Sequence, residues 1–527
     1  MNLSGGVPMN WVRTGRLPAL LLCFLICIAC GDVYRPTIIP NPVPTPDPKN
    51  FHSVFTVNQN GAANRGTGLQ VDVSGDSASG VTRVDRMPVH AAIQGSRIWV
   101  ANNLADSVSS FTVGAGTSTP IGTSVNVNLV PGSAPVFVQS TESGTMYVAN
   151  SGNATVNAIN TANNVITDTI PVGTFPIAMA ELPNGKKLYV VNRDSASVSV
   201  ITTVDKLVAA NLPVGTSPRW AVERSDGARV YVLSHDDGLL TTIDSLAPAD
   251  TVLGSVSVGA GADFMYYDSR RNRIYIPNPT TSSLAIYDVS ADPPVLLANI
   301  NLTAPIPAGG GAPCPVTGCS PVSATALPDG TRAYVASFYI DSTSPSCQQT
   351  PCLQTQVTVI DELTNQVTKS ISLPTVSVSP VGNCAAARFR ISAAAAPDSS
   401  RVYVASCDGS GVSSINPAGD RYFAAIPAPG SSFSPTLVNI TGVVQNGANS
   451  TYSYTYDPNS GVPVFLGLVI TISNLSQAAD NGTFTVTGIG NGTFTVSDPA
   501  GQPAANENGT GLGQPPGQNP VFILTGP

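Results

Sequence analysis

The sequence predicts an all-β protein in which a four-stranded sheet is repeated around a central axis. Only 11% of the residues are charged, and the chain holds 48 Gly and 45 Pro, so it is rich in turns and poor in helix. Short runs of Val, Ile, Thr and Ser alternate with turn residues, as in β-strands. A repeat of about 42–48 residues runs through most of the chain. One four-stranded sheet cannot bury both of its faces, and stacking such sheets around an axis does so.

The clearest copy of the repeat spans 185–218 and contains Leu-Tyr-Val-Val-Asn, a short turn, and Ser-Val-Ser-Val-Ile. The Tyr-Val-x-Asn strand followed by a Val-x-Val-Ile strand resembles the YVTN family of β-propeller repeats over roughly residues 51–430. Eight strand pairs of this kind predict eight blades, and seven is the competing count because the first copy is the weakest. The copies begin near Val54, Ile98, Met146, Leu188, Val230, Ile274, Ala333 and Val402.

We label the strands of a blade A to D from the axis outward. The first copy begins at strand B, so its strand A must come from elsewhere in the chain. Residues 434–440 look like the opening of a strand A, and we expect them to pair with residues 54–57 and close the ring. The propeller is therefore assigned to 51–441. Residues 442–527 predict a small sandwich-like β-module with a flexible tail, in which 498–519 form a loop or frayed arm.

The N-terminus predicts export. Arg13 and Arg16 precede an apolar stretch that is too short for an ordinary membrane span. The Ala-Cys-Gly that follows resembles the lipobox of bacterial lipoproteins, which implies a signal peptide over 1–29, lipidation of Cys30 and attachment to the cell envelope, with the outer membrane favoured. Cleavage by an ordinary signal peptidase is the alternative. Six prolines between residues 33 and 50 predict a stiff tether over 30–50.

Six cysteines remain in the predicted exported part of the chain. An even number in an exported protein predicts disulfides, and proximity in the sequence favours three pairs. Zinc is the rival interpretation, although no Cys-x-x-Cys spacing occurs among them. All six fall in connections that open on one face of the propeller, which is either the binding face or a set of stiffened loops. The favoured pairs are Cys314–Cys319, Cys347–Cys352 and Cys384–Cys407.

Aligning the openings of strand A predicts a ring of side chains around the channel mouth on that same face. The residue two after the opening proline is large in several copies, and such rings could stack a sugar, a peptide or a planar ligand; packing between blades is the alternative. Two arginines lie nearby and could contact an anion. The predicted mouth residues are His90, Phe137, Trp220 and Met265, with Arg193 and Arg219.

The sequence excludes some functions and leaves others open. The net charge is −8, and no Lys/Arg cluster is present, so nucleic acid is not expected as a partner. With three His and no recognised catalytic or cofactor motif, we expect no metal or cofactor; the turn His235-Asp236-Asp237-Gly238 is the nearest approach to a metal cluster.

Asp244, Asp288 and Asp361 end strand C in their copies and are expected to cap turns. Three functions stay open for the propeller. It could be a binding or scaffolding module for an envelope protein, a polysaccharide or a small ligand. It could also be a lactonase-like hydrolase or quinone-dependent dehydrogenase, or an adhesion component of the cell surface.

Overall fold

A computed structural model of the chain contains β-strands and short 3-10 helices. No helix among the described residues is long and apolar enough to cross a membrane. The predicted signal peptide, Cys30 and the tether lie outside the described residues. The structure describes residues 53–526 except 61–64, 74, 114–120, 142–143, 247–248, 346, 349–350, 379–383, 410, 428–435, 458–463, 465–467 and 514–518.

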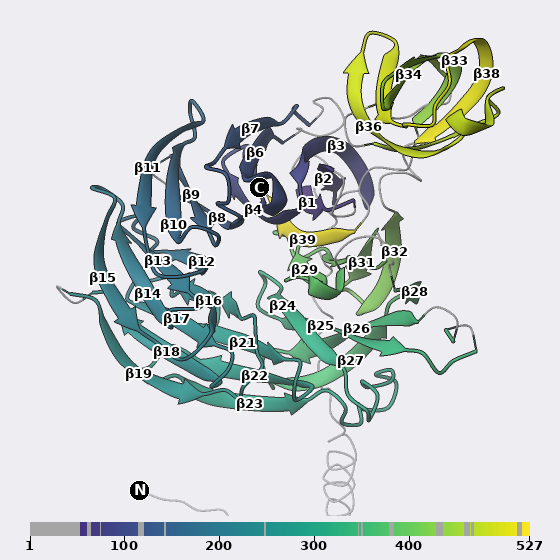
Figure 1. The fold of residues 1–527 in the computed structure, drawn as a ribbon. Helices are drawn as coiled ribbons and strands as arrows, with labels where there is room; N and C mark the ends of the chain where they lie inside the picture. The colour runs from purple at the N-terminus through teal and green to yellow at the C-terminus, as the bar shows by residue number, and fades with distance from the viewer. Residues whose placement is uncertain are drawn as a thin grey trace, which may run out of the picture. The chain divides into compact units, whose positions relative to one another are not determined.

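Eight antiparallel sheets form a β-propeller, which confirms the predicted fold and blade number (Figure 1). Blade 1 consists of β39 (Pro520–Thr525), β1 (Ser53–Asn58), β2 (Arg65–Asp72) and β3 (Ser77–Arg86). Blade 2 consists of β4 (Pro88–Gln94), β5 (Arg97–Asn102), β6 (Ser107–Thr112) and β7 (Val125–Asn128). Blade 3 consists of β8 (Pro135–Ser140), β9 (Thr145–Asn150), β10 (Thr155–Asn160) and β11 (Val165–Pro171). Blade 4 consists of β12 (Pro176–Glu181), β13 (Lys187–Asn192), β14 (Ser197–Thr202) and β15 (Leu207–Pro213).

The other four blades follow the same plan. Blade 5 consists of β16 (Pro218–Glu223), β17 (Arg229–Ser234), β18 (Leu239–Asp244) and β19 (Thr251–Ser257). Blade 6 consists of β20 (Tyr266–Asp268), β21 (Arg273–Asn278), β22 (Ser283–Asp288) and β23 (Val295–Asn301). Blade 7 consists of β24 (Ser320–Ala326), β25 (Arg332–Asp341), β26 (Cys352–Asp361) and β27 (Gln366–Ser372), with β28 (Val376–Ser377) pairing with β26. Blade 8 consists of β29 (Ile391–Ala395), β30 (Val402–Ser406), β31 (Gly411–Asn416) and β32 (Arg421–Pro427).

The strand that closes the ring is not the predicted one. Residues 54–57 pair with β39 near the C-terminus, and Val57 lies opposite Phe522. The segment predicted for this role instead contributes to β33 (Thr436–Asn446) of the C-terminal module, where it pairs with β34 (Asn449–Tyr456) and β38 (Ala504–Gly513). The module is thus inserted between the last strand of blade 8 and the first strand of blade 1, and the predicted boundaries of 51–441 and 442–527 are corrected accordingly.

The C-terminal module is all-β, as predicted, and its six strands close into a barrel instead of two packed sheets. The strand order is β33-β34-β37-β36-β35-β38, with β35 at Val469–Ser473, β36 at Gly482–Gly490 and β37 at Thr493–Ser497. The predicted loop over 498–519 contains strand β38, whose buried positions alternate and include Gly509, Gly511 and Gly513. A Cβ at Gly511 would lie 2.6 Å from Val438, so the glycines fit where the barrel interior has no room for a side chain.

The repeated tyrosine of strand B fastens each of several blades to the next one. Its hydroxyl reaches the connection between strands C and D of the following blade, and a basic residue two positions earlier binds the same connection. In blade 8, Tyr403 donates to Asp76 of blade 1 at 2.9 Å, while Arg401 pairs with Asp76 at 2.8 Å. The hydroxyl–carboxylate pairs in other blades are Tyr189–Asp250, Tyr275–Glu362 and Tyr334–Asp420.

The repeated asparagine of strand B also has a structural role. In blade 4 the side chain of Asn192 donates to Ser199 of strand C at 3.0 Å, and Ser199 donates to Asn211 of strand D at 2.7 Å. The same chain of hydrogen bonds links strands B, C and D in blade 2 through Asn102, Ser109 and Asn126. The two most recognisable residues of the repeat therefore stabilise the blades, which leaves the functional residues to the connections and to strand A.

Candidate functional site

Strand A opens in a recurrent way that aims side chains at the axis. The residue before the opening proline has a positive φ in five blades, for example 57° at Phe175 and 51° at Ser217. A bulge directly after the proline then shifts the register, as between Pro218 and Trp220. Positive φ is strained for residues other than glycine, and a bulge re-aims the side chain beside it. The opening thus explains why the second residue after the proline faces inward.

Six aromatic rings from different blades pack against one another at the axis. His90 stacks on Phe137 with a centroid distance of 3.8 Å and an interplanar angle of 20°. Trp220 contacts Phe137, Phe264 and Phe389 at centroid distances of 5.7, 4.9 and 5.7 Å, and Phe389 contacts Phe522 at 5.0 Å. We call these six residues the aromatic layer.

The aromatic layer separates two cavities. One, of about 460 Å³, is lined by the starts of the A strands, including Val89, Val136 and Ile177, and by Phe389. The other, of about 730 Å³, is lined by later residues of the same strands, such as Ile93 and Ser140, together with His90, Phe137 and Phe522. Because the A strands run along the axis, the cavities lie one beyond the other. We call the first cavity the mouth pocket, since it opens on the face that carries the disulfide-bonded connections.

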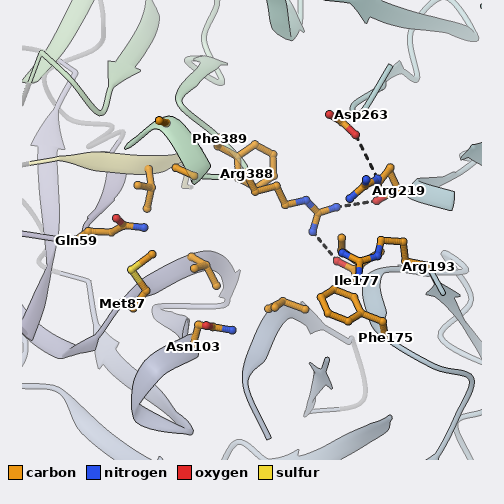
Figure 2. A pocket seen from close by; sticks show the side chains of 15 residues that line it. Gln59, Met87, Asn103, Phe175, Ile177, Arg193, Arg219, Asp263, Arg388 and Phe389 are labelled. Carbon is orange, nitrogen blue, oxygen red and sulfur yellow. Dashed lines mark hydrogen bonds and ion pairs between the residues drawn. The ribbon is translucent and has the colours of Figure 1, made fainter. Parts of the chain in front are cut away.

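Arg388 reaches into the mouth pocket from the connection that precedes blade 8 (Figure 2). Its guanidinium donates to the backbone carbonyls of Ile177 at 2.5 Å and Arg219 at 2.7 Å, which belong to blades 4 and 5 across the axis. It also lies over the ring of Trp220, 4.8 Å from the centroid. Burial, partly opposed by the charge of Asp263 and reinforced by that of Arg219, lowers the pKa of Arg388 to about 9, so the side chain is charged at neutral pH.

Two more arginines line the same pocket, and each has an acidic partner. Arg193 binds Asp194 with its Nε 2.5 Å from Oδ1 and lies over the ring of Phe175, 3.5 Å from the centroid. Arg219 pairs with Asp263 at 3.4 Å. Figure 2 shows the Arg219–Asp263 pair beside the two backbone hydrogen bonds of Arg388.

Gln59, from the connection after β1, belongs to the lining of the mouth pocket, but its side chain is almost wholly buried. Its residue is 1% exposed, and its Oε1 has no hydrogen-bond partner among the described residues. A buried amide oxygen without a donor costs roughly 1–3 kcal/mol. The Oε1 atom has almost no accessible surface, so a ligand in the pocket would reach it only if the side chain moved.

A disulfide holds the segment that carries Arg388 and Phe389. Cys384 bonds to Cys407 of the next B-to-C connection, and Asn519, directly before β39, donates to the Cys407 carbonyl at 2.9 Å. The closing strand and the disulfide therefore fix the same loop. The three disulfides are those that the spacing favoured, Cys314–Cys319, Cys347–Cys352 and Cys384–Cys407.

The structure brings most of the predicted mouth residues together, although in different settings. Arg193 and Arg219 line the mouth pocket, whereas His90 and Phe137 line the other cavity. Trp220 is buried in the aromatic layer. Burial lowers the pKa of His90 well below its usual value, with a further contribution from Arg388, so its imidazole is neutral.

One predicted mouth residue lies elsewhere, and several others were missed. Met265 is buried in the hydrophobic core, and its neighbour Phe264 contacts Trp220 instead. Sequence reasoning missed Arg388 and Phe389 because they lie in an insertion outside the repeat. It missed Phe522 because blade 1 was closed with the wrong segment, although Phe522 stands two residues after a proline, like Phe137 and Trp220.

The segment from His235 to Gly238, which the sequence offered as the nearest approach to a metal cluster, forms a turn between strands B and C of blade 5. Asp237 accepts the Thr216 amide at 2.7 Å, and His235 binds Asp236 at 2.7 Å. In the part of the chain that is described, no three His, Cys, Asp or Glu residues are grouped so that they could hold a metal ion. The aspartates that end strand C accept backbone amides two residues ahead, as expected for turn caps: Asp244 from Leu246, Asp288 from Ser290, and Asp361 from Leu363.

No protein-family model matches the chain, and no curated protein matches its sequence. Solved structures do match in fold. AztD from Citrobacter koseri aligns with a TM-score of 0.49 and 13% identity over 72% of this chain and 95% of its own. Hydrazine synthase from Kuenenia stuttgartiensis aligns with a TM-score of 0.43 and 16% identity over 56% of this chain and 88% of its own. Virginiamycin B lyase from Staphylococcus aureus aligns with a TM-score of 0.42 and 12% identity over 61% of this chain and 92% of its own. Likenesses at these levels carry no inference about a ligand or an activity.

Proposed function

We propose that this protein is an envelope lipoprotein whose propeller is a binding module for a small molecule, held in the mouth pocket. The N-terminal signal, Cys30 and the proline-rich tether support the anchoring part of the proposal, and the Tyr-Val-x-Asn strands support placing the blades in the YVTN family. The anchor would hold the module at the membrane surface, with the outer membrane favoured.

One observation carries the binding part of the proposal. The aromatic layer closes the axis beneath a cavity of about 460 Å³ whose lining combines an arginine held by two backbone carbonyls with apolar side chains such as Ile177 and Phe389. Cavities of roughly 300–1,000 Å³ with apolar walls and a few convergent polar groups are typical of small-molecule sites. The pocket stands on rigid strands and a disulfide-bonded loop, so little ordering is needed when a ligand binds.

A thermal-shift screen of the full chain, with its disulfides intact, tests this function. A compound that binds only the folded state raises the melting temperature in a saturable way. We expect such a compound to lose its effect in Ala387→Trp, because Ala387 lines the pocket and a Trp would fill it. Ala418→Trp, in an exposed turn of blade 8, is the matched control. A screen without any saturable shift, or hits unaffected by Ala387→Trp, would contradict the proposal.

The anchoring part has a separate test. The wild-type chain should partition into the detergent phase of a membrane extract and carry a diacylglyceryl group on Cys30 in mass spectra, and Cys30→Ala should do neither. Detergent partition that survives in Cys30→Ala would overturn the lipoprotein assignment.

A further inference from the structure

The charges around the mouth pocket leave one positive charge unmatched. Arg193 and Arg219 each have an aspartate partner, Asp194 and Asp263. Arg388 makes its hydrogen bonds, among the described residues, to two backbone carbonyls, and no carboxylate lies within 4 Å of its guanidinium there. The pocket therefore has a net charge of about +1 in a protein of net charge −8.

The guanidinium of Arg388 also has hydrogen-bonding capacity left over. A guanidinium has five N–H groups, and the two carbonyls take two of them. The side chain lines the pocket, so a ligand inside it can reach the remaining donors. The backbone carbonyls fix the plane of the guanidinium, which is the arrangement that favours a paired, directional contact with a carboxylate.

The acidic partners limit how much negative charge a ligand can bring. Asp263 lines the pocket and is 53% exposed, and Asp194 accompanies Arg193 at its rim. A second negative charge on the ligand would face these carboxylates. A single carboxylate matches the unpaired arginine, whereas a phosphate dianion would be repelled.

The rest of the lining describes the body of the ligand. Much of the pocket wall is apolar and is formed by Phe175, Ile177, Met87 and Phe389. Among the polar lining residues, Gln59 belongs to blade 1, whereas Arg388 comes from the connection before blade 8 and is bound to blades 4 and 5.

From these contacts we infer that the ligand is a small monocarboxylic acid with an apolar body. The acid group binds Arg388, and the apolar body lies against Phe175 and Phe389. This inference rests on the proposed function and narrows it to one class of ligand. The acid could be a free metabolite or the C-terminus of a short peptide, and both share the same chemistry at Arg388.

Isothermal titration with matched probes tests the inference. Each set contains an acid, its amide and the corresponding amine on one body, beginning with 4-hydroxyphenylacetate, 4-hydroxyphenylacetamide and tyramine, and extending to indole and straight-chain bodies. Tripeptides with free or amidated C-termini form the peptide arm, and any hit from the broad screen is added with its amide. We expect at least one acid to bind tenfold or more tightly than its amide and its amine.

Variants of Arg388 locate the contact with the carboxylate. Arg388→Gln should weaken the acid about 10- to 100-fold, because a hydrogen bond to a charged group is lost, and should bring its affinity to that of the amide. Arg388→Lys should restore part of the preference for the acid. Arg421→Gln, at an exposed position of β32, should change nothing.

The outcomes separate this inference from the proposed function. Amides or amines that bind as tightly as the acids, or acid binding that survives Arg388→Gln, would overturn the carboxylate assignment and leave a small-molecule pocket. A ligand from the broad screen that binds in the pocket and carries no carboxylate would likewise overturn the carboxylate assignment while keeping the small-molecule pocket. If neither the probes nor the screen gives a ligand that Ala387→Trp abolishes, the proposed function fails as well.

Discussion

Replacing Tyr403 with Phe tests whether the repeated tyrosine fastens blades together. The change removes one hydroxyl, which donates to Asp76 of blade 1 at 2.9 Å from a fully buried ring. A hydrogen bond to a charged group contributes roughly 1.5–3 kcal/mol. Asp76 keeps its ion pair with Arg401 at 2.8 Å, so its carboxylate is not left alone. We expect the free energy of unfolding to fall by about 2 kcal/mol.

The chain offers a matched control in blade 3. Tyr147 occupies the same position of strand B and is equally buried, but its hydroxyl has no hydrogen-bond partner among the described residues. Tyr147→Phe should therefore leave stability unchanged within about 0.5 kcal/mol, or raise it. Urea unfolding followed by Trp fluorescence measures both variants. Equal losses in the two would refute the reasoning, because the ring and not the hydrogen bond would then carry the effect.

Three further changes probe the closure, the loop and a buried acid. Ile523→Asp places a charge in the closing strand at a residue that is 4% exposed, and it should prevent the ring from closing. Circular dichroism should then show that cooperative unfolding is lost, whereas a normal melting curve would contradict the closure by β39. Cys384→Ser with Cys407→Ser opens a bridge between residues 23 apart and should cost about 3 kcal/mol of stability, measured in urea against the wild type with its disulfides intact; an unchanged midpoint would show that the bridge is dispensable. Burial raises the pKa of Glu223 to about 7, so the folded state holds that proton more tightly than the unfolded state. The contribution of Glu223 to stability should be full below about pH 4.5 and should fall by about 1–3 kcal/mol as pH rises through 7, and Glu223→Gln should remove that part of the pH dependence; an identical pH profile in both proteins would refute the assignment.

The repeat made most of the propeller predictable. The alternating strands B and C recur in every copy, and their spacing predicted eight blades because each unit must bury its faces against neighbours. The closing strand was assigned wrongly because a barrel of about 80 residues lies in the chain between the last strand of blade 8 and strand A of blade 1. The useful signal was present, since Pro520 and Phe522 repeat the spacing of Pro218 and Trp220.

The candidate site was only partly predictable, for a physical reason. The bulge after the opening proline fixes the inward direction of His90, Phe137 and Trp220, so the alignment of prolines found these residues. Blade 6 lacks that proline, so the sequence alignment was one residue out of register there and predicted Met265 in place of Phe264. Arg388 lies in an insertion with no counterpart in other blades, and its role depends on reaching across the axis to blades 4 and 5, which no periodic pattern encodes.

A crystal structure of the protein with its tightest carboxylate ligand tests the central claim most directly. The ligand should occupy the mouth pocket, with its carboxylate within hydrogen-bond distance of the Arg388 guanidinium and its body against Phe175 and Phe389. A ligand found in the cavity beyond the aromatic layer, or on the outer strands of a blade, would contradict the account.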